Sequence, residues 1–229
     1  MLDLASQILA GEQKSEGSSF VDFSGRRVGF NGAPDGYYNI IEDANHRVVM
    51  HLKPAESLTE LGMHVDGVGI FYRGLNILVE LQEDSSLQVR VDGKQLGMDM
   101  RRQLSKQLYS MVLPAGSIAI SRLASGSELI IETDLLEIRI SRTESGGDSD
   151  HLSFSAALLF PPEHLEGIWG EGYNRAVAGA AHGKPDNDSP KSSPNDYKLP
   201  GYFPGAAFPV LASGGDLDAA KATYTTQRA

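Results

Sequence analysis

The fold is decided by residues 22–43, which read DFSGRRVGFNGAPDGYYNIIED. Two short runs of β-forming residues, 20–23 and 27–30, flank a Ser-Gly turn, and an aromatic run follows at 37–41. The loop before that aromatic run is rich in Gly, Asn, Pro and Asp, the residue types that adopt or preset turn geometry. The spacing therefore predicts two tight chain reversals, as expected for antiparallel β-structure.

The same alternation of apolar and polar residues continues along the chain. Residues 46–52 are well placed to pair with 37–41, and Asp92-Gly93 is a strong hairpin turn signal. Further strands are expected at 67–72, 77–81, 87–91, 108–113, 118–121, 129–132, 136–141 and 152–158. Because these strands do not alternate with helices, we predict an all-β fold, either an antiparallel β-sandwich or a flattened barrel.

The composition divides the chain into three parts. Residues 1–18 are expected to form a short amphipathic helix followed by a polar linker. Residues 19–174 form the predicted β-sandwich domain, and residues 175–229 form a Gly- and Pro-rich extended segment. A late apolar stretch of that segment is expected to pack either onto the β domain or onto another subunit.

Charge and cysteine content exclude several classes of function. The formal net charge of −10 argues against general nucleic-acid binding, which needs clustered Lys and Arg. The chain has no cysteine, so disulfides, zinc-thiolate sites and thiolate nucleophiles are excluded. No apolar run approaches the roughly 20 residues of a membrane span, so we expect no membrane insertion. The first residues make a poor signal peptide; if the protein is exported, its signal lies outside this sequence.

Motifs of catalysis are missing from the sequence. The six histidines show no HExxH spacing, and neither a GxSxG elbow nor a phosphate-binding loop is present. Asp150-His151 beside Ser149 is the nearest approach to a triad fragment, but triads assemble in space and adjacency does not define one. We therefore predict a protein that is not an enzyme.

Four segments carry a family resemblance, and they occur in the family's order. They read FSGRRVGFNGAPDGYYNIIEDANHRVVMHL (23–52), GVGIFYRGLNILVEL (67–81), HLSFSAALLFPPEHLEGIWGEGYN (151–174) and YFPGAAFPVLASGGDLDAA (202–220). Together they resemble the von Willebrand factor type D superfamily in its cysteine-poor plant and algal branch, the root-cap and late-embryogenesis-abundant-related proteins. In that family the third segment is a closing strand followed by a Gly-Ile-x-Gly-x-x-Tyr turn.

The resemblance implies a structural protein that works in a larger assembly with other protein subunits, at the cell surface or outside the cell. The missing signal and cysteines fit the cytosol or an organelle equally well, so the compartment stays open. Trp169 stands where adhesive members carry a cysteine, so their disulfide-linked multimers do not carry over. Several members bind calcium just after the closing turn, and Asn174 falls near that place.

The candidate site residues follow from these observations, each with a plainer alternative. Calcium needs six to eight oxygen ligands, which could come from Asn174, Asp186, Asn187 and Asp188; the alternative is a solvated Asp/Asn loop. Trp169 could stack on a sugar or plug the end of the sandwich. Arg101 and Arg102 could dock an acidic partner or be solvated. The remaining interaction candidates are Tyr202, Phe203 and Phe208.

The predicted function is accordingly a non-enzymatic structural or protein-interaction module without a required cofactor. The alternative is a module that binds calcium or carbohydrate.

Overall fold

The computed structural model describes residues 13–16, 19–21, 27–30, 32–54, 63–96, 107–113, 116–122, 128–144, 150–182 and 193–204. Antiparallel strands dominate these residues, which confirms the all-β prediction. The described part also contains helix α2 (Gly167–His182) and a 3-10 turn, η1 (Pro194–Tyr197). The predicted helix near the N-terminus lies outside the described residues.

The strands form one continuous, curled sheet, ordered β10-β11-β12-β13-β14-β6-β5-β4-β15. Its main strands are β4 (Gly36–Glu42), β5 (His46–Pro54), β6 (Met63–Tyr72), β7 (Leu75–Leu81), β8 (Leu87–Val91), β9 (Lys94–Gln95), β10 (Gln107–Leu113), β11 (Gly116–Arg122), β12 (Glu128–Glu132), β13 (Leu136–Thr143) and β14 (His151–Leu158). Three short strands, β1 (Gln13–Glu16), β2 (Ser19–Val21) and β3 (Arg27–Gly29), attach beside β14, and β15 (Lys198–Leu199) attaches to β4.

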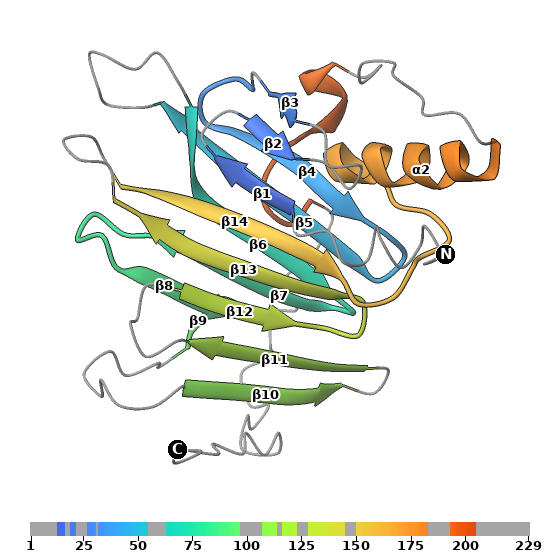
Figure 1. Cartoon of the computed structure of the whole chain (residues 1–229). Helices are drawn as coiled ribbons and strands as arrows, with labels where there is room; N and C mark the ends of the chain where they lie inside the picture. The colour runs from blue at the N-terminus through green and yellow to red at the C-terminus, as the bar shows by residue number, and fades with distance from the viewer. Residues whose placement is uncertain are drawn as a thin grey trace.

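The sheet folds back on itself because one edge of β6 pairs with two different strands. Residues 67–72 of that edge pair with β7, whereas Val65 pairs with Leu152 of β14. Strands β10 to β14 therefore form one layer, and strands β4 to β8 form a second layer behind it (Figure 1).

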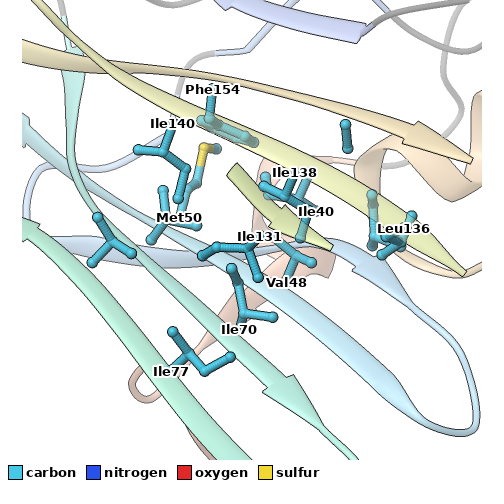
Figure 2. Packing of buried hydrophobic residues seen from close by; sticks show 14 of the residues in the cluster. Ile40, Val48, Met50, Ile70, Ile77, Ile131, Leu136, Ile138, Ile140 and Phe154 are labelled. Atoms are coloured by element: carbon cyan, nitrogen blue, oxygen red, sulfur yellow. The ribbon is translucent and has the colours of Figure 1, made fainter. Parts of the chain in front are cut away.

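The core lies between these two layers. Ile131, Ile138, Ile140 and Phe154 from the first layer face Val48, Met50, Ile70 and Ile77 from the second (Figure 2). All of them belong to one cluster of buried side chains. The apolar half of each alternating strand thus faces inward, as the period of two predicts.

Helix α2 packs beside β4 (Figure 1). Its presence shows that the sequence prediction was wrong in two respects. The expected turn at 167–173 is helical, and residues 175–182, predicted as extended, continue that helix. The helix begins at Gly167, which has φ +87°, and a Cβ there would lie 2.6 Å from the Ile40 carbonyl carbon. Only glycine permits this close start against β4.

The N-terminal linker prediction is also wrong where the structure describes it. Residues Gln13–Glu16 form β1 and pair with β14 at Gln13↔Ala156 and Lys14↔Ser155. Residues 15 and 16 of the same strand pair with β2, so β1 connects β14 to the short strands β2 and β3. No helix in the described part of the chain is long and apolar enough to cross a membrane.

Candidate functional site

The outer face of the second layer carries a trough on β6. Gly67 and Gly69 occupy successive outward positions, while Val68 between them points into the core. A Cβ at Gly67 would overlap the Tyr202 hydroxyl and lie 2.9 Å from Cζ, and one at Gly69 would lie 2.9 Å from Tyr202 Cβ. The two glycines therefore leave room for the Tyr202 side chain.

Tyr202 belongs to a segment that we call the strap, residues 198–204. The strap begins as β15, which pairs with the edge of β4 at Lys198↔Tyr38 and Leu199↔Tyr37. Farther along, the Arg47 guanidinium donates a hydrogen bond to the Pro204 carbonyl at 3.3 Å. Tyr202, which belongs to the late apolar stretch, lies on the β domain of its own chain.

Aromatic rings flank Tyr202 in the trough. The Tyr37 ring meets it edge-on with centroids 4.8 Å apart, and the His51 ring lies 6.0 Å away. Burial raises the pKa of the Tyr202 phenol, and the nearby Asp66 and Glu80 carboxylates raise it further. The hydroxyl therefore stays protonated over the physiological pH range.

His51 links this aromatic group to a carboxylate. Its Nδ1 donates to Asp66 Oδ1 at 2.6 Å. That hydrogen bond raises the pKa of His51 above its ordinary value, although burial of the ring opposes the shift. A protonated His51 thus contributes an ion pair directly beside the strap.

Two clefts lie on either side of the strap. The first, of about 360 Å³, lies between residues 200–204 and the hairpin side chains of Asn76, Leu78 and Arg90, with Gly93 at the hairpin turn. The second, of about 260 Å³, lies toward the β4–β5 turn. Its lining residues are Glu42, Asp43, Ala44, His46, Arg47, Phe71, Phe203 and Pro204. Phe203 and Pro204 line both clefts.

A Thr-His-Asp arrangement lies at the end of the sandwich where hairpin turns meet. His46 Nδ1 donates to Asp43 Oδ1 at 3.1 Å, and Nε2 lies 3.0 Å from Thr133 Oγ1. Thr133, however, is only 5% exposed, and its Oγ1 accepts hydrogen bonds from the backbone N–H groups of Leu135 and Leu136. The hydroxyl that a triad would use as nucleophile is therefore enclosed and already engaged in the β12–β13 turn.

The polar side chains at this end of the sandwich connect neighbouring hairpin turns through hydrogen bonds. Arg73, in the β6–β7 turn, donates to Asp134 Oδ2 at 2.6 Å in the β12–β13 turn. Burial alone would raise the pKa of Asp43, but hydrogen bonds from His46 and the Asn45 backbone outweigh it and lower the pKa. The charged Asp43 thus holds His46 in place, and His46 reaches from the second layer to the first.

The structure places two of the predicted site residues away from the surface roles proposed for them. Trp169 is fully buried, with its ring 5.2 Å from that of Phe154, so it plugs the core and offers no platform to a sugar or partner. Asn174 holds the preceding loop: its Nδ2 donates to Leu165 O at 2.5 Å, and its Oδ1 accepts from Leu165 N at 3.2 Å. The side-chain oxygen that calcium binding would need is therefore already engaged by a backbone N–H group.

The other predicted candidates have mixed outcomes. Arg101, Arg102, Asp186, Asn187, Asp188 and Phe208 lie outside the described residues. Within the described ranges, no group of three or more His, Asp or Glu side chains is placed to hold a metal ion. Asp150, part of the triad fragment considered from sequence, accepts a hydrogen bond from Arg142 Nε at 2.7 Å.

Sequence reasoning missed the trough and the first cleft. The signal for the trough was present, since glycines inside an apolar strand often mark close approach by another backbone or ligand. The Gly67-Val68-Gly69 run has this pattern. Asn76 and Arg90 give no comparable signal, because their meeting with the strap depends on tertiary structure.

Comparison with known proteins adds no relative. The chain matches no known family profile and no curated protein. The resemblance to the von Willebrand factor type D superfamily therefore stays a prediction.

Proposed function

We propose that this chain is a non-enzymatic assembly module, which joins protein subunits by holding an extended aromatic segment on the outer face of β4 to β7. The observation that carries the proposal is the position of Tyr202 over Gly67 and Gly69. This docking combines two elements of peptide recognition, strand addition at a sheet edge and a pocket for one side chain.

The two elements contribute differently. Pairing of β15 with β4 uses main-chain groups and is therefore tolerant of sequence. The trough is selective, because a flat ring fits over two residues that lack side chains. Tyr37 and His51 line its side: the Tyr37 ring meets the Tyr202 ring edge-on, and the His51 ring lies tilted toward it. A segment with an aromatic residue three positions after the paired strand would meet both requirements.

The occupant we propose in an assembly is the strap of a second copy of the chain. Identical chains already carry both complementary surfaces, so exchanging the strap needs no new contact, and such swapping is a low-cost route to oligomers.

Disulfide trapping tests this exchange directly, because the chain contains no cysteine of its own. Tyr37 and Leu199 are register partners in the β4–β15 pair. We expect the Tyr37→Cys variant mixed with the Leu199→Cys variant to give disulfide-linked dimers. Light scattering of the wild-type chain should likewise show a dimer or larger species.

Two controls make the outcome interpretable. The double variant Tyr37→Cys/Leu199→Cys checks that the geometry allows the bond. A mixture of Leu199→Cys with Glu163→Cys, at an exposed position, measures random cross-linking. The proposal is wrong if the double variant closes within one chain while the mixture cross-links no faster than this control and the wild type is monomeric.

A further inference from the structure

Strand β10 lies at the lower border of the first layer, next to β11 (Figure 1). It pairs with β11 over its full length, from Gln107↔Arg122 to Leu113↔Gly116, without a register shift. Within the part of the chain that the structure describes, no strand pairs with its other edge. Alternate residues of a strand direct their N–H and C=O groups to that edge, where a further strand can pair with them.

The other borders of the sheet are short or covered. β15 pairs with the outer edge of β4. The border beyond β8 is β9, which has two exposed residues including Lys94, and β3 at a third border has three residues. Short strands and charged side chains discourage pairing between sheet edges. Strand β10 has neither protection: it has seven residues, and its sequence QLYSMVL contains no charge and no proline.

A second copy of β10 fits this edge. Two identical antiparallel strands match each other about a two-fold axis, so a single edge supplies both halves of the contact. With the axis at Ser110, the centre of the strand, residues 107–113 of the two copies overlap completely. Pro114 follows directly, and because it has no N–H it limits the overlap at each end. The strand carries no charge, so no like charges come opposite each other, although the chain as a whole has a net charge of −10.

We propose that two copies of the chain pair edge to edge through β10, which extends the layer of β10 to β14 across the two-fold axis. This interface goes beyond strap exchange and does not depend on it, because the strap lies at the β4 edge, at the other end of the strand order. A protein with both contacts would link exchanged dimers into larger assemblies. One strand pair is a small interface, so the association should depend on the concentration of the chain.

Cysteine cross-linking at Ser110 tests the pairing, because the two-fold axis brings the two copies of this residue together. Opposed residues of antiparallel strands have Cα atoms about 4.5–5.5 Å apart, within reach of a disulfide. We expect Ser110→Cys to form disulfide-linked dimers about tenfold faster than the exposed control Glu163→Cys, because pairing raises the effective concentration of one thiol at the other. Strap exchange does not bring Ser110 of two copies together, so this experiment and the one with Tyr37 and Leu199 can fail separately.

A charge at the same position should separate the copies. Ser110 is the register partner of half-buried Ala119, whereas Ile118 and Ile120 on either side of Ala119 are core residues, so we expect the fold to tolerate Ser110→Lys. In the paired state two lysines would lie opposite each other, which opposes pairing. Where the wild type is associated, light scattering of Ser110→Lys should show a mass about twofold lower. The mass that remains in this variant reports strap exchange alone.

Ser117→Lys is the matched control, because it places the same charge at an exposed position of β11, one strand away from the edge. It should keep the mass of the wild type. Circular dichroism melts confirm that each variant is folded. The proposal is overturned if Ser110→Cys cross-links no faster than Glu163→Cys, or if a folded Ser110→Lys keeps the wild-type mass.

Hydrogen–deuterium exchange distinguishes a second copy from a segment of the same chain at this edge. Pairing between copies should slow exchange of the β10 amides that do not bond to β11, and this protection should grow with chain concentration. Protection of the same amides in a monomer, unchanged on dilution, would assign the edge to a segment of the same chain and overturn the proposal.

Discussion

Replacing Gly67 with alanine should expel Tyr202 from its trough. The added Cβ overlaps the Tyr202 hydroxyl and comes within 2.9 Å of Cζ. The ring has little room to move aside, because Gly69 already lies beneath it and the Tyr37 ring stands 4.8 Å away. Gly69 and Tyr37 both belong to hydrogen-bonded strands of the sheet. We therefore expect the strap to move away from the sheet, and the sheet itself to keep its shape.

The size of the effect follows from two opposing contributions. Withdrawing a largely buried aromatic ring costs about 2 kcal/mol of stability. Replacing glycine with alanine in a strand returns roughly 0.5 kcal/mol, because the unfolded chain loses conformational freedom. The net loss should be about 1.5 kcal/mol, which lowers a urea midpoint by about 0.7 M for a slope of about 2 kcal/mol/M.

Urea unfolding followed by circular dichroism measures this loss, and a double-mutant cycle with Tyr202→Ala assigns its cause. In the Tyr202→Ala background the same change at Gly67 should stabilise slightly, giving a coupling of about 2 kcal/mol. Gly201→Ala is the matched control: a Cβ there meets nothing within 4 Å, so the midpoint should not fall. Equal effects of Gly67→Ala in both backgrounds would refute the reasoning.

Three further predictions concern other contacts. Trp169→Ala should destabilise by about 3–5 kcal/mol because its fully buried ring fills the core beside Phe154; a loss below about 1 kcal/mol in urea unfolding would contradict this. Thr133→Val keeps the side-chain shape but removes the oxygen that accepts hydrogen bonds from two backbone N–H groups, so the free energy of unfolding should fall by about 1–3 kcal/mol. An unchanged free energy of unfolding would show that the turn does not need the hydroxyl. The hydrogen bond to Asp66 raises the pKa of His51 in the folded state. The stability that His51 contributes is therefore fully present below about pH 6.5, the ordinary pKa of histidine, and is lost as the pH rises through the folded-state pKa. Melting temperatures measured from about pH 5.5 to about pH 9 should show this decline in the wild type and not in Asp66→Asn.

Local sequence pattern was sufficient to predict the hairpins. The turn at residues 43–45 joins the two strands expected of it. The Asp92-Gly93 turn follows the expected strand 87–91, but it leads into the short strand β9, which was not predicted. Period-two alternation also identified the inward-facing residues correctly, for example Ile138 and Ile140. These features depend on neighbours in sequence, where turn chemistry and side-chain alternation act directly.

Helix α2 could not be predicted in the same way. Its first turns contain Gly167, Gly170 and Gly172, and each interior glycine costs about 1 kcal/mol of helix propensity relative to alanine. Tertiary packing overrides this cost, because Ile168, Trp169 and Tyr173 are all buried in the core. Two of these glycines also let the helix approach its neighbours closely, Gly167 toward β4 and Gly170 toward Leu165.

The candidate site depends on contacts distant in sequence. The Gly67 and Gly69 pattern is compatible with a close approach, but the sequence prediction did not use it, and nothing local identifies Tyr202 as the residue that approaches. The junction of β6 with β14 is equally non-local, resting on Val65 and Leu152. For Trp169 the sequence left two roles, a sugar-stacking platform or a plug at the end of the sandwich, and its complete burial fits the plug.

Hydrogen–deuterium exchange of the strap tests the central claim most directly, because the pairing of β15 with β4 should slow amide exchange there. We expect the amides of β15, residues 198 and 199, to be protected in the wild type and to lose that protection in Tyr202→Ala, while peptides from β5 and β6 stay protected in both. Equal exchange of the strap in the two proteins, or no protection in the wild type, would contradict the account.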